Sequence, residues 1–148
     1  MTLKEKLMED LKSAMRSKEK RRKDTITMLR AAVKQREVDE RKEMADDEIL
    51  ALIGKQVKQK RESIKDFQKA ERVDLVEQAQ EEIDILLAYL PEQLTEEEID
   101  ELVREAIEQT GATSMRDMGR IMGIVMPKVK GRADGSLISQ SAKKLLNQ

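Results

Sequence analysis

Apolar residues recur every three or four positions along almost the whole chain, which is the spacing of one face of an α-helix. The first run begins at Leu3 and Leu7 and follows Thr2 and Glu5, whose spacing is the signature of a capping box. Of the 148 residues, 29 are Lys or Arg and 30 are Asp or Glu, while the aromatic side chains are one Phe and one Tyr. The core must therefore consist of aliphatic side chains and Met on good helix-forming segments, so the sequence predicts an all-α protein.

Helix ends are indicated by caps and breakers. Asp46 and Asp134 are expected to cap two helices, Thr95 with Glu98 makes a second capping box, and Gly111 is placed to end a helix in the left-handed conformation. There is no β-hairpin signal and no internal repeat. The expected helices cover, approximately, residues 3–17, 20–43, 46–70, 73–90, 95–111, 114–127 and 134–146.

Pro91 interrupts the helical pattern, because proline lacks the amide hydrogen and restricts the residue before it. The segment 89–95 is therefore the expected boundary between two domains. We expect an N-terminal four-helix domain with long helices over residues 1–92, and a small three-helix domain over residues 93–148. The inward-facing stripes are expected to include Val73 in the first domain and Leu137 in the second.

The chain contains no His and no Cys, which excludes thiolate nucleophiles, imidazole bases and ordinary zinc sites. Adjacent carboxylates such as Asp46 and Asp47 lie at expected helix starts, where they complement the helix dipole, so we expect no catalytic residue, no metal and no cofactor. The first residues do not resemble a signal peptide, and no apolar run is long enough to span a membrane. The sequence therefore predicts a soluble cytoplasmic protein.

Charge is segregated along the chain: residues 12–23 and 116–148 are rich in bases, and residues 92–108 are rich in acids. Segregated charge favours a binding face over uniform solvation. A chain with one Phe and one Tyr has no platform on which bases could stack. Any nucleic acid would therefore be recognised through its backbone and shape.

A basic stripe runs along the expected helix 46–70, within about 80° of the helix circumference. It consists of Lys58, Arg61, Lys65 and Lys69. Such a stripe could follow a phosphate backbone. The alternative is a solvated face that Glu62 and Asp66 partly neutralise.

The segment 118–135, MGRIMGIVMPKVKGRADG, is the most distinctive in the chain. Gly119 and Gly123 are four residues apart and leave a strip of helix without side chains. The cations around this strip are Arg116, Arg120, Lys128, Lys130 and Arg132. The strip could admit a sugar-phosphate backbone, or a neighbouring helix could pack closely on it. The methionines nearby are either core residues or an adaptable groove for a partner.

Two segments, 58–99 and 118–135, closely resemble the YqeY proteins of the GatB/YqeY family, and the resemblance extends over essentially the whole chain. It implies an all-helical fold with a larger N-terminal and a smaller C-terminal domain. A related domain forms the tail of the B subunit of the tRNA-dependent Asp/Glu amidotransferase and is appended to some glutaminyl-tRNA synthetases. In those proteins the tail is implied to bind the body of tRNA near its elbow.

The glycine-rich motif of that tail has matching positions in this chain. They are Gly119, Gly123, Val125, Met126, Lys130, Gly131, Arg132 and Ala133. The chain departs from the motif at Pro127, where the amidotransferase tail usually has Lys, so the corresponding contact is absent or moves to Lys128. The kinase-like catalytic cradle of the amidotransferase B subunit has no counterpart in this sequence.

The resemblance leads to three hypotheses. The first is a non-catalytic accessory protein that binds tRNA. The second is a protein-interaction module that docks on an aminoacyl-tRNA synthetase, an amidotransferase or the ribosome through the acidic helix 96–108 or the Met-rich face. The third is a component of a carbon–nitrogen ligase with glutamine as amido-N-donor. For the first hypothesis the nucleic-acid-binding residues are Arg116, Gly119, Arg120, Gly123, Lys128, Lys130, Gly131 and Arg132, with Lys58, Arg61, Lys65 and Lys69 as a second surface.

Overall fold

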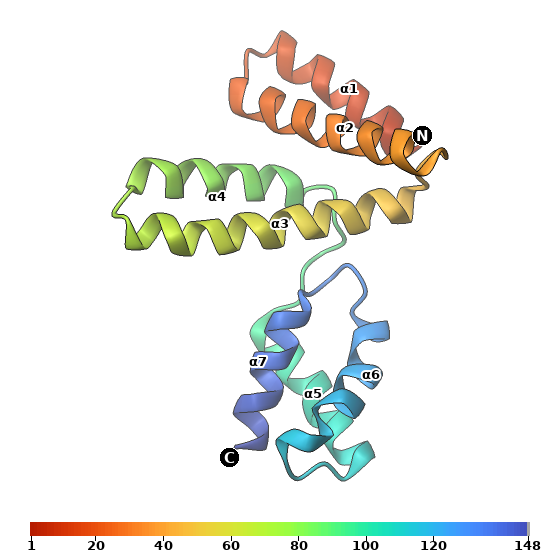
Figure 1. Ribbon diagram of the computed structural model, residues 1–148, viewed down its shortest axis with the longest axis vertical. Helices are drawn as coiled ribbons and strands as arrows, with labels where there is room; N and C mark the ends of the chain where they lie inside the picture. Colours follow the sequence, from red (N-terminus) through yellow and green to blue (C-terminus); the bar gives the residue numbers. More distant parts are fainter. Residues whose placement is uncertain (148) are drawn as a thin grey trace. The chain divides into compact units, whose positions relative to one another are not determined.

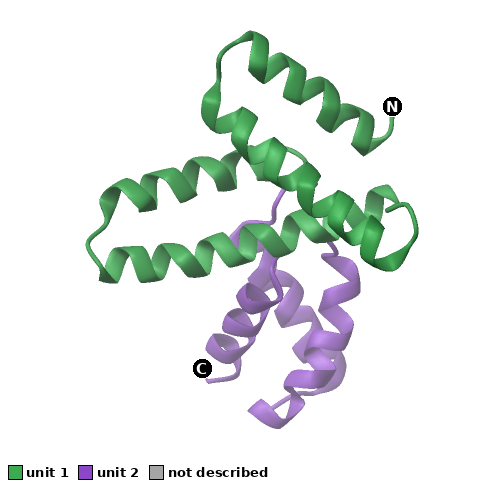
Figure 2. Ribbon diagram, turned by 45° about the horizontal axis from the view of Figure 1, so that its top comes forward, with its two compact units in different colours: residues 1–90 green, residues 91–148 purple. Residues whose placement is uncertain are grey.

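The computed structural model describes residues 1–147, and within them the chain forms seven α-helices, one short 3₁₀ helix and no strand (Figure 1). The all-α prediction is therefore confirmed. The chain divides into two compact units, Met1–Leu90 and Pro91–Gln148 (Figure 2). Their independence as folding domains, with the predicted division between residues 92 and 93, stays a prediction.

The first unit consists of two helical hairpins, with α1 beside α2 and α3 beside α4 (Figure 1). Its helices are α1 (Leu3–Arg16), α2 (Lys20–Glu40), α3 (Asp46–Lys69) and α4 (Val73–Leu87). Each helix contributes to one apolar cluster, with Leu7, Ile26, Ile53 and Leu86 almost completely buried. The aliphatic stripes of the sequence therefore form most of the core, and the partly buried Tyr89 packs against it.

The second unit packs three helices around its own apolar cluster, whose centre includes Val103, Ile121, Val125 and Ile138. Its elements are α5 (Glu96–Thr110), the 3₁₀ helix η1 (Met115–Asp117), α6 (Met118–Lys128) and α7 (Gly135–Leu146). The helix α5 contacts both α6 and α7, and α6 also contacts α7. This arrangement leaves one face of α6 without a covering helix from this unit, as the exposure of its residues shows below.

The local signals at helix ends mostly form as predicted. Both capping boxes are present, at Thr2 and at Thr95, so each hydroxyl and its partner Glu satisfy amide hydrogens of the first turn. Gly111 ends α5 with φ of 68°, a conformation that costs glycine little. Asp134 caps α7 by accepting a hydrogen bond from the amide of Ser136 at 3.0 Å.

Asp46 is not a helix cap, contrary to the prediction. Ala45 occupies the cap position of α3, and Asp46 is the first residue of the helix. Its carboxylate instead accepts a hydrogen bond from the amide of Leu3 at 3.1 Å. Tertiary packing places the start of α1 next to the start of α3, and the carboxylate satisfies a free amide at the other helix.

Two helix ends differ from the prediction. The helix α2 ends at Glu40 because Arg41 adopts a left-handed conformation with φ of 54°, and α4 ends at Leu87, before Pro91 is reached. The helix α6 ends at Lys128, directly after Pro127, close to its predicted end. A proline near the end of a helix removes one hydrogen bond and does not have to stop the last turn.

Two residues predicted to face inward are exposed. Val73 has 65% of its surface accessible and Leu137 has 40%. Val73 is the first residue of α4, where few neighbouring turns can cover a side chain. Leu137 lies in the first turn of α7, next to the buried Ile138. Helical spacing alone does not distinguish the covered middle of a stripe from its ends.

Candidate nucleic-acid interface

The exposed face of α6 is a bare strip of helix. Gly119 and Gly123 are both exposed, and a Cβ atom added at either position would meet no atom within 4 Å. Within the second unit, therefore, no neighbouring helix packs on this glycine pair, which leaves the alternative of an open strip. Glycine in a helix costs about 1 kcal/mol relative to alanine, and no contact within this unit explains that cost.

The strip lies opposite the buried side of α6. Ile121 and Val125 are completely buried, whereas Met126 is 39% exposed and Pro127 is exposed. At 100° per residue the two glycines, Met126 and Pro127 fall within about 100° of the helix circumference. The open face of α6 therefore presents backbone and small or apolar side chains, with no long polar side chain at its centre.

Pro127 changes the hydrogen bonding of the strip. In a regular α-helix the carbonyl of residue 123 accepts the amide hydrogen of residue 127. Proline has no amide hydrogen, so the carbonyl oxygen of Gly123 lacks this partner. The departure from the tail motif thus removes a cation and one hydrogen bond from the last turns of the helix.

Three of the predicted cations are free to contact a ligand. Arg116, Lys128 and Lys130 are exposed, and none has an ion pair or side-chain hydrogen bond with any residue that the structure describes. Arg120 is partly engaged, because its guanidinium lies 3.3 Å from the carbonyl oxygen of Thr110 and 3.6 Å from a carboxylate oxygen of Asp117. Its side chain is still 64% exposed.

Gly131 and Arg132 hold the start of the unit in place. The amide of Leu94 donates to the carbonyl of Arg132 at 2.9 Å, and the Arg132 Nε donates to the carbonyl of Glu92 at 3.1 Å. The side-chain amide of Gln93 donates a hydrogen bond to the carbonyl of Gly131. Gly131 itself has φ of 77°. The prediction of both residues as ligand contacts misses this structural role, which depends on segments almost forty residues apart.

The basic stripe on α3 forms as predicted and is not neutralised. Lys58, Lys65 and Lys69 are exposed and Arg61 is half-buried, and within residues 1–147 no carboxylate lies within ion-pair distance of them. The expected pairing with neighbouring acids is therefore not observed. Gly54 lies on the same face of the helix, and a Cβ atom there would also meet nothing within 4 Å.

A buried polar cluster that the sequence did not indicate joins α5 to α7. The carboxylate of Asp100 accepts hydrogen bonds from the Ser141 hydroxyl at 2.5 Å and from the Lys144 ammonium at 2.6 Å. Asp100 and Ser141 are buried, and the cluster borders a cavity of about 340 Å³. The only sequence signal is that Asp100 follows Ile99 on the inward stripe of α5.

The charges of this cluster limit its chemistry. The hydrogen bond from Lys144, with a second from Ser141, holds the pKa of Asp100 below its ordinary value, and the same contact raises the pKa of Lys144. A carboxylate with a lowered pKa is a poor base, and a protonated amine has no free lone pair. The cluster therefore joins α5 to α7 through one ion pair and one hydrogen bond.

The single tyrosine also has a structural environment. The Tyr89 hydroxyl donates to the carboxylate of Asp10 at 2.6 Å, and the Lys6 ammonium lies 5.6 Å from the centre of its ring. Burial, followed by the contact with Asp10, raises the pKa of Tyr89 well above its ordinary value. The phenol therefore stays protonated and ties the end of the first unit to α1.

Two properties of the described residues bear on other kinds of site. No group of three or more carboxylates among residues 1–147 is arranged to hold a metal ion. No helix in the same part of the chain is both long enough and apolar enough to cross a membrane. Two large apolar side chains of the second unit are exposed, Met115 at 42% and Leu137 at 40%.

Comparisons with known proteins agree with this architecture. A family model described as Yqey-like protein matches residues 4–146. The chain is 38% identical to "Altered inheritance of mitochondria protein 41, mitochondrial" of Pyrenophora tritici-repentis, over 95% of this chain and 79% of that protein. It is 32% identical to the protein of the same name from Lachancea thermotolerans, over 91% of this chain and 76% of that protein.

A second group of relatives shares only part of the chain. A glutamyl-tRNA(Gln) amidotransferase subunit of Thermococcus gammatolerans is 42% identical over 62 residues. These residues make up 42% of this chain and 10% of that protein. The similarity is therefore to one small segment of a much larger protein.

Proposed function

The chain belongs to the YqeY-like protein family, and on this premise we propose that it is a non-catalytic accessory protein that binds tRNA through its backbone and shape. The similarity to a segment of an amidotransferase subunit supports a role related to that enzyme. Because the match covers 10% of the subunit, the proposal does not extend to amide transfer. Catalysis in such a complex would belong to other domains.

The bare strip of α6 is the observation on which the proposal depends. Gly119 and Gly123 have no packing role within the second unit, which supports the proposal that their missing side chains make room for a ligand. A strip of exposed helix backbone lets a sugar-phosphate chain approach closely, and Arg116, Lys128 and Lys130 are free to contact phosphates.

The stripe on α3 would form a second RNA contact. Its four cations extend over about 16 Å of helix, at 1.5 Å per residue from Lys58 to Lys69. A row of this length can contact several phosphates of one RNA helix. Gly54 at the head of the row leaves room for a close approach.

The proposal is tested by measuring tRNA binding at several salt concentrations. We expect the affinity to fall steeply with salt, because each phosphate contact releases counterions. Replacing Arg116, Lys128 and Lys130 together by Ala should reduce the slope of log K against log salt by about 0.7 to 0.9 for each phosphate contact removed.

The matched control removes the same charge from α1 and α2. Lys12, Arg16 and Lys20 are exposed cations of the basic segment 12–23, and replacing them by Ala changes the net charge equally. The control should keep most of the slope. An equal reduction of the slope in both triple variants would mean that the RNA is attracted by positive charge anywhere on the protein. A slope near zero in the unmodified protein would refute RNA binding.

A protein partner is the second candidate, and the exposed apolar residues favour it. Met115, Met126 and Leu137 are each about two-fifths exposed, and methionines adapt readily to a partner surface. The partner would be an aminoacyl-tRNA synthetase or an amidotransferase. Co-purification of such an enzyme that survives nuclease treatment would support this candidate, whereas loss of the enzyme on nuclease treatment would support binding through RNA.

Location is a separate prediction. We predict a cytoplasmic protein from the composition of the chain, whereas the names of two relatives assign those proteins to mitochondria. Imaging of a C-terminal fluorescent fusion, with a mitochondrial marker, distinguishes the two locations. Overlap with the marker would reject the cytoplasmic prediction.

A further inference from the structure

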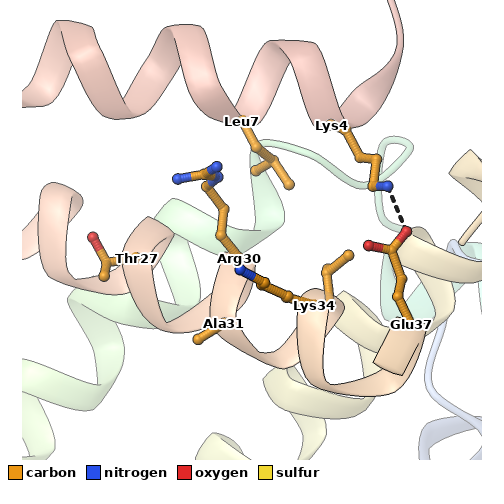
Figure 3. Close-up of a pocket in the computed structure, with 8 residues that line it drawn as sticks. Lys4, Leu7, Thr27, Arg30, Ala31, Lys34 and Glu37 are labelled. Atoms are coloured by element: carbon orange, nitrogen blue, oxygen red, sulfur yellow. Dashed lines mark ion pairs between the residues drawn. The ribbon is translucent and has the colours of Figure 1, made fainter. Parts of the chain in front are cut away.

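A cavity of about 480 Å³ lies between α1 and α2, within the first unit and apart from every residue of the proposed RNA surfaces (Figure 3). Its apolar part is formed by Leu7 and Val33, both buried, and by Ala31. This volume is within the range of small-molecule sites in proteins. The cavity therefore has the size to hold a compact ligand, above a floor formed by Leu7 and Val33.

Two cations extend into this cavity without a partner. Arg30 reaches from α2 toward Leu7 of α1, and Lys34 lies one helical turn further along α2 (Figure 3). Neither side chain has an ion pair or hydrogen bond with the residues that the structure describes, although Arg30 is half-buried. Like charges four residues apart on a helix repel each other, and a bound anion would relieve this repulsion.

The acid that lines the cavity is already engaged. Glu37 pairs with Lys4 and also accepts the amide hydrogen of Met44 at 2.8 Å. The hydrogen bond from Lys4 is the main cause that holds the pKa of Glu37 below its ordinary value. Since Lys4 and Glu37 neutralise each other, the cavity has two uncompensated positive charges, on Arg30 and Lys34.

The geometry points to a binding site for a phosphate monoester with an apolar or aromatic body. The phosphate, which has close to two negative charges at neutral pH, matches Arg30 and Lys34, and the guanidinium can form two parallel hydrogen bonds to its oxygens. The apolar body contacts Leu7, Ala31 and Val33. This site does not depend on RNA binding, and it assigns a small-molecule ligand to a part of the chain that the proposed function does not use.

Phenyl phosphate is the probe for this site, added to the full-length protein and followed by NMR. We expect saturable shifts at the resonances of Leu7, Ala31 and Val33, with a dissociation constant of about 1 mM or below. Inorganic phosphate should bind more weakly because it lacks the apolar body, and benzoate because it has a single charge. No saturation by about 10 mM phenyl phosphate would overturn the proposal. Equal binding of all three compounds would also overturn it.

Variants locate the site. Arg30→Gln should weaken the binding of phenyl phosphate about tenfold, and Lys34→Gln should weaken it too, because each removes a charged hydrogen bond. Arg36→Gln is the matched control: it removes the same charge from the same helix at a residue that does not line the cavity, so affinity should stay within about twofold. An equal loss in the Arg36 variant would refute the site.

Two further measurements keep the interpretation unambiguous. Circular dichroism should show unchanged helix content in the Arg30 variant, and Lys34→Gln repeats the test at an exposed residue if the Arg30 variant is unfolded. The affinity of Arg30→Gln for tRNA should equal that of the unmodified protein. A parallel loss of tRNA affinity would place the cavity within an RNA surface and reject it as a separate small-molecule site.

Discussion

At Gly119 and Gly123, the space around the missing Cβ atom distinguishes a packing role from a binding role. A glycine that packs against a neighbour cannot accept a methyl group, whereas these two have open space where that group would lie. Within the second unit they only reduce helix stability. The proposed binding role therefore gives a test in which stability and binding change in opposite directions.

Replacing both glycines by alanine should increase the free energy of unfolding by up to about 1 kcal/mol per site and should weaken tRNA binding. Denaturant unfolding measures the first effect and fluorescence anisotropy with labelled tRNA the second. Gly111→Ala is the control that should change stability in the opposite direction. Because φ at this residue is 68°, an alanine there should lower the free energy of unfolding by about 1 kcal/mol. A decrease in stability for the strip variant would show that the chain itself uses these glycines.

The single residue Asp100 also allows a prediction of how the stability of the protein depends on pH. Its folded pKa is lowered, first by the hydrogen bond from Lys144, so the ionised carboxylate stabilises the fold above its ordinary pKa of 3.8. This contribution is lost as the pH falls through the lower folded value. Asp100→Asn should therefore cost about 1 to 3 kcal/mol at neutral pH, because hydrogen bonds to a buried charge are removed.

The difference in unfolding free energy between the unmodified protein and Asp100→Asn is measured from pH 7 down to pH 3. It should begin to shrink below about pH 4, because the unfolded chain then binds a proton that the native carboxylate, with its lowered pKa, does not yet bind. Lys144 has a raised pKa, so its own contribution is lost only in alkaline solution, as the pH rises through the folded value. A difference that stays constant over the acidic range would exclude the ionised Asp100 as the stabilising form.

At the scale of elements, helix ends follow from local chemistry wherever a capping side chain or glycine is present. The boxes at Thr2 and Thr95 and the glycine at Gly111 are examples. The helices α2 and α3 end without a glycine at the cap, and the turn that follows each of them places one residue in the left-handed conformation. Arg41 and Glu71, which follow α2 and α3, have φ of 54° and 55°, a region that side chains other than glycine rarely adopt.

Glu71→Gly should therefore stabilise the protein by about 0.5 to 1 kcal/mol, because glycine adopts this left-handed conformation without the cost of a side chain. Thermal unfolding measures the effect as a higher melting temperature. Glu77→Gly provides the control, since Glu77 is exposed within α4 and the same substitution there should cost about 1 kcal/mol. A lower melting temperature for Glu71→Gly would show that its side chain has a stabilising contact that outweighs the backbone cost.

For the whole molecule, the two apolar clusters predict two folding domains. The second cluster draws its buried residues from α5, α6, α7 and the segments between them, and the link formed by Gly131 and Arg132 with residues 92–94 is also internal to this unit. A unit of this size buries less of its surface than a larger domain and is only marginally stable. It has nevertheless a complete core of its own.

The fragment 91–148 should fold alone. We expect helical circular dichroism and a cooperative thermal transition, because the buried residues of this unit contact one another. The fragment 1–90, which contains the other apolar cluster, should also fold alone. A non-cooperative or unfolded fragment 91–148 would show that the second unit needs the first for stability.

The sequence by itself determined the helical class, the approximate helix positions, the capping boxes and the residues on each face of α3 and α6. These properties depend on local propensity and on a period of 3.6 residues, which can be read along the chain. The family resemblance was also visible in the sequence, at the glycine-rich segment and before Pro91.

Only the tertiary structure decided which faces are covered. It showed that the strip at Gly119 and Gly123 is open, that Arg132 holds residues 92–94, and that Asp100 meets Lys144 from another helix. It also placed Arg30 in a cavity formed with α1. These facts depend on contacts between residues distant in the chain, and helical periodicity contains no information about which other helix, if any, lies opposite a given face.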